Sequence, residues 1–208
     1  MRASLLRWNG WLLLACLFAA APVPAQSLTP QVRQPQATVV VFAAFSCPYC
    51  AQAAQTLAAL QKRYPDALAV QFKHFPLGLE PEDLLAHEAA LAAAAQDKFP
   101  QFHDALFRQP QRGLGRAVLD QLAEQAGLDM VRYRRDMDGH VWRSRVEDDR
   151  REAAAFGVRA TPTFFVQGFK LEGIPAADVF ETLIDQALAK AASTAPPSAQ
   201  QESAHATP

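Results

Sequence analysis

The sequence predicts an α/β fold into which an α-helical domain is inserted. Short apolar segments rich in β-branched and aromatic residues mark strands on either side of residues 82–157, which carry only helical signals. The expected strands cover 39–45, 68–75, 161–166 and 169–172, and the expected helices outside the insertion cover 51–64 and 176–192. The order is therefore strand–helix–strand, a helical domain, and then a hairpin followed by a helix.

The first strand passes directly into the first helix. If Cys47 is the N-cap, Pro48 occupies the first helical position, where its missing N–H and fixed φ are no disadvantage. The second strand, 68–75, alternates in polarity and is expected to run parallel to the first through the helical crossover. Pro76 ends it.

Five helices are expected in the insertion, and one more closes the fold. The insertion helices cover 82–96, 99–108, 116–126, 130–139 (with Asp129 as N-cap) and 141–156. Gln167-Gly168 is a tight turn between the last two strands. The closing helix should direct an apolar face inward, formed by Val179, Phe180, Leu183, Ile184 and Leu188.

The two ends of the chain are expected to lie outside the α/β fold. Residues 1–25 have a basic start, an apolar centre and small residues before a cleavage site near Ala25, which predicts a signal peptide and export to the periplasm. An uncleaved anchor is disfavoured because the apolar run is short, and a lipoprotein site at Cys16 is a weaker alternative. Residues 26–36 form a polar lead, and 193–208 an Ala/Pro/Ser/Gln-rich tail expected to be disordered.

Charge gives no reason to expect a nucleic-acid partner. Removing the signal takes away two arginines and no acid, which leaves 18 basic and 21 acidic residues. A slightly acidic balance suits neither nucleic acid nor an anionic membrane surface.

Cys47 and Cys50 are the only cysteines expected to remain after signal cleavage. On the first turn of a helix, Cys-X-X-Cys places its two sulfurs close enough to bridge. Unpaired N–H groups at the helix start favour the Cys47 thiolate, and each pKa unit corresponds to about 30 mV of redox potential. Cys47 is the predicted attacking sulfur and Cys50 the resolving one, in an oxidising compartment.

Two other interpretations of the pair are weaker. A structural zinc site needs four ligands, and the sequence has no second Cys-X-X-Cys and no histidines at metal spacing, so we expect no metal. An inert structural disulfide would close too short a loop to stabilise the fold much.

From Thr38 to about Ala189 the chain resembles the DsbA-like thiol–disulfide oxidoreductases, which have a thioredoxin-like fold with an inserted α-helical domain. The resemblance rests on the motifs FSCPYC at 45–50, KHFPL at 73–77, FHDALF at 102–107 and GVRATPTFFV at 157–166. It implies a thioredoxin-like domain formed by 37–78 and 158–192, and an insertion over 79–157.

The resemblance also implies a second half of the site. Pro162 is expected to be cis and to face the cysteine pair, which would expose the Thr161 backbone to an extended substrate segment. Pro48 and Tyr49, between the cysteines, are the other expected substrate contacts. The family pattern has a buried acid six residues before the first cysteine, where this chain has Val41. We therefore expect Cys50 to lack a direct carboxylate partner.

Three further features are interpreted as structural. His74, at a strand end, is predicted to be a structural polar residue, although it could approach the active-site face. The Met130/Tyr133/Met137 stripe is predicted to be core. Opposite charges spaced i,i+4 predict a solvated helix face, formed by Arg143, Arg145, Glu147, Asp149 and Arg151.

The predicted function is an exported, monomeric oxidoreductase that introduces disulfide bonds into reduced or misoxidised exported proteins, without a cofactor. The resemblance implies reoxidation by a DsbB-like membrane partner. A disulfide isomerase or reductase is the main alternative, favoured slightly by Thr161 before the proline. The family's isomerases dimerise through an N-terminal domain, which 26–36 is too short to form. A non-catalytic chaperone or thiol–metal carrier is a third possibility.

Overall fold

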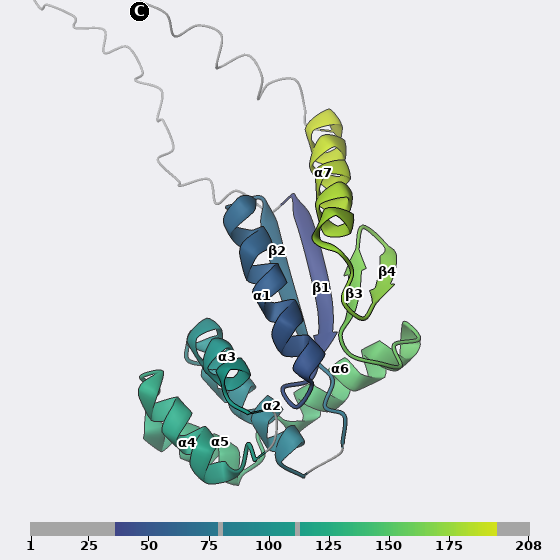
Figure 1. Cartoon of the computed structure of the whole chain (residues 1–208). Coiled ribbons are helices and arrows are strands. Elements are labelled where there is room, and N and C mark those ends of the chain that lie inside the picture. The colour runs from purple at the N-terminus through teal and green to yellow at the C-terminus, as the bar shows by residue number, and fades with distance from the viewer. Residues whose placement is uncertain (1–35, 79–80, 111–112, 195–208) are drawn as a thin grey trace, which may run out of the picture. The chain divides into compact units, whose positions relative to one another are not determined.

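A computed structural model describes residues 36–78, 81–110 and 113–194 (Figure 1). The predicted signal peptide, the polar lead up to residue 35 and the tail from 195 lie outside the described residues. The helices are α1 (Pro48–Arg63), α2 (Pro81–Ala94), α3 (Phe99–Arg108), α4 (Arg116–Gln125), α5 (Met130–Asp138), α6 (Arg143–Ala155) and α7 (Ala177–Thr194). Within the described residues, no helix is long and apolar enough to cross a bilayer.

Four strands form one mixed sheet in the order β2-β1-β3-β4. β1 (Ala37–Ala43) runs parallel to β2 (Leu68–His74) and antiparallel to β3 (Thr163–Val166), which pairs with β4 (Phe169–Glu172). Val41 lies opposite Phe72 on one side and Phe164 on the other. The predicted thioredoxin-like α/β fold with a helical insertion is confirmed.

The side chains of β1 point alternately to the two faces of the sheet. Val39 and Val41 point to the core shared with α1 and α7. Phe42 points the other way and packs with Ala153 of α6 and with Val158. Because successive strand side chains point to opposite faces, one strand anchors helices on both sides of the sheet.

The insertion has its own apolar core. Alanines of α2 pack there against Phe102, Leu106, Tyr133 and Met137. Their small side chains allow the neighbouring helices to approach closely, and the predicted core role of Tyr133 and Met137 is confirmed. Met130 is partly buried against the same cluster.

Several predicted boundaries and one apolar face need correction. β1 ends at Ala43, because the chain then turns and the Cys47 amide donates to the Ala44 carbonyl. α7 continues to Thr194, two residues into the predicted tail. Val179 is 38% exposed because it lies in the first turn of α7, at the edge of a buried stripe that includes Ala187 instead.

The predicted solvated face of the helix after residue 141 is wrong at Asp149. This carboxylate is buried and accepts a hydrogen bond from the His74 amide at 3.0 Å. Its other oxygen lies 3.4 Å from Lys73 Nζ. A buried carboxylate needs such partners, so Asp149 ties α6 to the end of β2.

Candidate active site

Cys47 lies at the junction of β1 and α1. It is the N-cap of α1, with extended dihedral angles (φ −98°, ψ 117°), and Pro48 occupies the first turn. The Cys50 amide donates to the Cys47 carbonyl at 3.0 Å. The predicted N-cap is therefore confirmed, and it places both cysteines on one helical turn.

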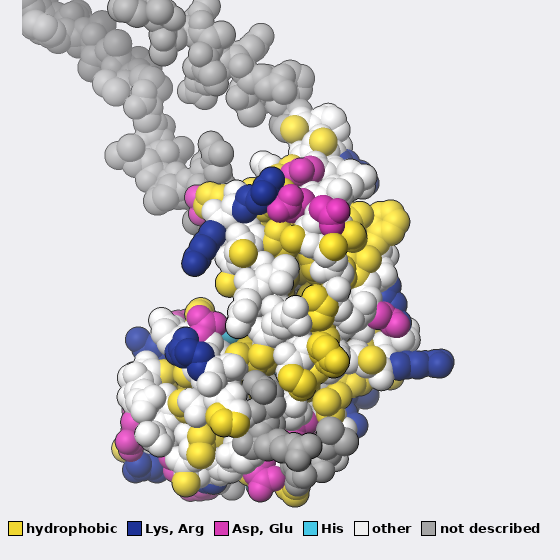
Figure 2. All heavy atoms as spheres, viewed as in Figure 1, with side chains coloured by type: hydrophobic (Ala, Val, Ile, Leu, Met, Phe, Trp, Pro, Cys, Tyr) yellow, Lys and Arg dark blue, Asp and Glu magenta, His cyan; other side chains and the backbone are white. Residues whose placement is uncertain are grey.

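The two cysteines are free thiols with little exposed surface. Cys47 is 4% exposed and Cys50 is 1% exposed. Pro48 and Tyr49 between them are exposed, and Tyr49 retains 63% of its accessible surface. Hydrophobic side chains also gather on the surface over the first turn of α1 (Figure 2). An apolar surface therefore lies beside the cysteine pair.

The loop before β3 reaches Cys47 from the other half of the fold. The Thr161–Pro162 peptide bond is cis, which confirms that prediction. Cys47 Sγ lies 3.5 Å from the Thr161 carbonyl oxygen. Two hydrogen bonds hold the loop, from the Gly173 amide to the Pro162 carbonyl and from Thr163 Oγ1 to the Ala160 carbonyl.

The environment of Cys47 favours its thiolate. A hydrogen bond from the Cys50 thiol is the largest cause, and with further donors it lowers the pKa of Cys47 from 9.0 to about 6 despite the opposing effect of burial. The further donors are the Thr161 side chain and the backbone amides of Cys50 and Tyr49. The sequence predicts a role for the amides at the helix start, but the neighbouring thiol lowers the pKa of Cys47 more than they do.

Cys50 has the opposite character. Its hydrogen bond to Cys47 and its burial raise the pKa of the Cys50 thiol far above the ordinary value. The pair thus shares one proton, held by the inner sulfur. An ionised outer sulfur and a protonated inner sulfur can together carry out thiol–disulfide exchange.

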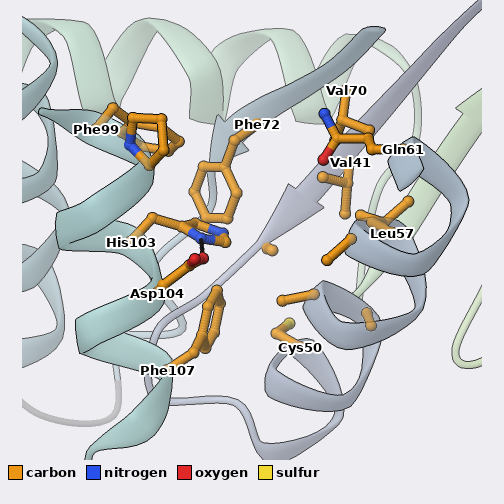
Figure 3. A pocket seen from close by; sticks show the side chains of 15 residues that line it. Val41, Cys50, Leu57, Gln61, Val70, Phe72, Phe99, His103, Asp104 and Phe107 are labelled. Carbon is orange, nitrogen blue, oxygen red and sulfur yellow. Dashed lines mark hydrogen bonds and ion pairs between the residues drawn. The ribbon is translucent and has the colours of Figure 1, made fainter. Parts of the chain in front are cut away.

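Behind Cys50, a pocket of about 240 Å³ opens between α1 and α3 (Figure 3). The surface is hollowed between these helices (Figure 2). Val41 and Phe72 form part of its apolar wall, and His103 and Asp104 of α3 face Cys50 across it. The residue at the family's acidic position is therefore a buried valine that lines the same pocket as the inner thiol.

His103 and Asp104 were not identified as site residues from the sequence. Both lie in the FHDALF motif, which supports the family resemblance but assigns no role to either side chain. The spacing Phe99–His103–Phe107 could have indicated its position, because residues four apart share a helix face. Among the described residues, no group of three or more His, Cys, Asp or Glu side chains is arranged to hold a metal ion.

Residues 34–186 match the protein-family description of thioredoxin. The chain belongs to the thioredoxin family. Its structure is similar to a thioredoxin-like oxidoreductase from Silicibacter pomeroyi DSS-3, with 26% identity, a TM-score of 0.67 and coverage of 74% of this chain and 88% of that one. The predicted membership of a DsbA-like thioredoxin-fold family is thereby confirmed.

More distant structures share the fold. BdbD from Bacillus subtilis is 22% identical with a TM-score of 0.68, and the alignment covers 75% of this thioredoxin-family chain and 89% of BdbD. Wolbachia pipientis alpha-DsbA1 is 20% identical with a TM-score of 0.66, over 76% and 89% of the two chains.

Curated relatives match in sequence over a segment only. The Na(+)/H(+) antiporter NhaA of Herminiimonas arsenicoxydans is 38% identical over 138 residues, which are 66% of this chain and 22% of the antiporter. NhaA 3 of Salinispora tropica is 37% identical over 155 residues, 73% of this chain and 24% of that protein. The thioredoxin-family chain thus spans less than a quarter of the curated relatives it matches.

Proposed function

We propose that this thioredoxin-like oxidoreductase is exported and donates a Cys47–Cys50 disulfide to reduced substrate proteins. The observation that carries the proposal is the position of Cys47 at the N-cap of α1 and 3.5 Å from the Thr161 carbonyl oxygen. There the Cys50 thiol and further donors lower the pKa of Cys47 to about 6. A sulfur that is stable as a thiolate is a good leaving group, so a disulfide containing it is readily reduced and oxidises other thiols.

The reaction proceeds in two exchanges. A substrate thiolate attacks Cys47 Sγ, the Cys47–Cys50 bond breaks, and the Cys50 sulfur takes up a proton. The second substrate thiolate then attacks the substrate sulfur of the mixed disulfide, and Cys47 leaves as a thiolate. Two electrons pass from substrate to enzyme, and a DsbB-like membrane partner would accept them to restore the disulfide.

Substrate would bind beside the cis-proline loop. Thr161 lies within 3.5 Å of the attacking sulfur and offers backbone groups to an extended segment. Pro48 and Tyr49 provide exposed apolar contact next to it. Export and a periplasmic location belong to this proposal, supported by the basic and apolar start of the sequence. A structural neighbour from Salmonella enterica, 24% identical, is itself described as a periplasmic thioredoxin-like protein.

One experiment tests the donor role. The Cys47–Cys50 pair is equilibrated with glutathione, and the protein is then given a reduced and a scrambled test protein to refold. A donor has an oxidising potential and acts on the reduced protein. Greater activity on the scrambled protein would favour the isomerase alternative, for which Thr161 before the proline is the supporting observation. Activity retained by the double Cys→Ser variant would favour a chaperone.

A further inference from the structure

The protonated inner thiol needs a base. When Cys47 carries a mixed disulfide, Cys50 can attack only after its S–H bond gives up its proton. The Cys50–Cys47 bond then forms, and the other sulfur leaves as a thiolate. Cys50 is 1% exposed, so its proton cannot pass directly to bulk water.

The pocket behind Cys50 contains a candidate for that base. Of the described residues that line it, only Cys50, His103 and Asp104 carry titratable side chains. The remaining walls are apolar except for Gln61. A volume of about 240 Å³ has room for several water molecules, which could connect the thiol to the imidazole.

His103 is held firmly in this position. Its ring packs against four phenylalanine rings with centroid distances of 4.8–6.0 Å, from Phe45, Phe72, Phe99 and Phe107. Its Nδ1 lies 2.9 Å from Asp104 Oδ1. Because a carboxylate can only accept, Nδ1 carries the proton of this hydrogen bond, and the neutral ring keeps its lone pair on Nε2.

His103 and Asp104 also connect the pocket to solvent. The His103 side chain is 17% exposed and that of Asp104 is 64% exposed. Figure 3 shows the His103 ring projecting from α3 into the space that Cys50 faces from α1. A proton received inside the pocket can therefore leave through the outer side of the same ring.

We propose that His103 accepts the proton of Cys50 through water in this pocket when the disulfide closes, and returns it when the disulfide opens. Asp104 is a positioning residue that fixes the tautomer. The inference rests on the proposed thiol–disulfide exchange and adds the route of its proton. Burial also lowers the pKa of His103, against the effect of Asp104, which favours the neutral ring that a base requires.

Other titratable groups near His103 do not provide this route. His74 on β2 is close enough for its pKa to respond to His103. However, His74 Nδ1 lies 2.9 Å from Nδ1 of His87 on α2, and neither residue lines the pocket. The titratable groups near His103 are thus Asp104 on its own helix, Cys50 across the pocket, and His74 on the neighbouring strand.

The test follows the reactions of the two thiols as separate kinetic phases. The reduced full-length chain is mixed with one equivalent of Ellman's reagent in a stopped-flow instrument. The first phase is attack by Cys47, and the second is attack by Cys50 on the mixed disulfide. The variants are His103→Phe, which keeps an aromatic ring, Asp104→Asn, and Gln61→Ala as a control from the same pocket.

We expect His103→Phe to slow the second phase about 100-fold at pH 7, within the usual range for general-base catalysis, and to leave the first phase unchanged. The wild-type second phase should show a pH inflection that His103→Phe lacks. Asp104→Asn should slow it about 10-fold, the lower end of the effect of groups that orient a functional histidine, and Gln61→Ala should not change it. Asp104 is exposed, so its variant tests the proposal even if His103→Phe does not fold.

Two results would overturn the inference. One is a second phase as fast as wild type in folded His103→Phe or Asp104→Asn. The other is equal slowing of both phases, which would show a packing defect rather than a missing base. If the wild-type protein shows no first phase at all, the proposed exchange function fails, independently of His103.

Discussion

Cys47 Sγ lies 3.5 Å from the carbonyl oxygen of Thr161, a residue 114 positions further along the chain. This contact joins the start of α1 to the loop before β3. It depends on the pairing of β1 with β3, which brings Val41 opposite Phe164. The candidate site therefore exists only when the segments on either side of the helical insertion have assembled into one sheet.

Replacing Cys50 tests the origin of the Cys47 thiolate. The Cys50 thiol is the largest cause of the low pKa of Cys47. We expect Cys50→Ala to raise that pKa from about 6 toward 9.0, whereas Cys50→Ser retains a hydroxyl donor and should keep it lower. The rate of alkylation by iodoacetamide against pH measures it. The same pKa in both variants would show that backbone donors, rather than the inner side chain, hold the thiolate.

The Thr161 side chain makes a separate contribution to the low pKa of Cys47. The residue's carbonyl oxygen lies 3.5 Å from Cys47 Sγ, and its side chain lowers the pKa of Cys47. Thr161→Val removes the hydroxyl with little change in shape, so the pKa should rise and the disulfide should become less oxidising. Thr161→Ser keeps the hydroxyl and is the matched control. Glutathione equilibration measures the potential, and an unchanged potential in Thr161→Val would contradict this role.

The sequence predicted the elements better than the side-chain environments. The N-cap at Cys47 and the cap of α5 at Asp129, which accepts from two backbone amides, follow from local chemistry, so they could be predicted. The burial of Asp149 and the pocket position of His103 depend on how α6 and α3 pack against distant segments. The spacing of residues along one helix does not show which distant segments that helix packs against.

Val41 offers a gain-of-function test. It lines the pocket with Cys50, so Val41→Glu would place a carboxylate beside the inner thiol. We expect faster resolution of the Cys47 mixed disulfide, about 10-fold, at a stability cost of about 1–3 kcal/mol for burying a polar group. The second stopped-flow phase measures the rate, and urea unfolding measures the cost.

The control for this prediction is Val41→Gln, which has a similar size but no basic carboxylate. A faster second phase in both variants would indicate a packing effect rather than proton transfer. In the His103→Phe background, Val41→Glu should restore much of the lost rate, because the new carboxylate would replace the missing base. An unchanged rate in either background would argue against proton transfer at this position.

The buried His74–His87 pair should make stability depend on pH. Their Nδ1 atoms are 2.9 Å apart. Burial lowers the pKa of His74 from 6.5 to about 3 and that of His87 well below its ordinary value. Above pH 6.5 both histidines are neutral in the folded and in the unfolded chain. As the pH falls below 6.5, the unfolded chain binds protons that the folded one excludes. The free energy of unfolding should then decrease by up to about 1.4 kcal/mol per pH unit per histidine.

This loss should continue from pH 6.5 down to about 3, where His74 also becomes protonated in the folded state. His87→Asn removes one titrating group, so its unfolding free energy should fall less steeply over this range. Phe99→Leu is the control, because it weakens the same aromatic cluster without removing a titratable group and should shift the whole curve downward. Urea unfolding at a series of pH values gives both slopes. Equal slopes for wild type and His87→Asn would mean that the carboxylates alone account for the acid sensitivity.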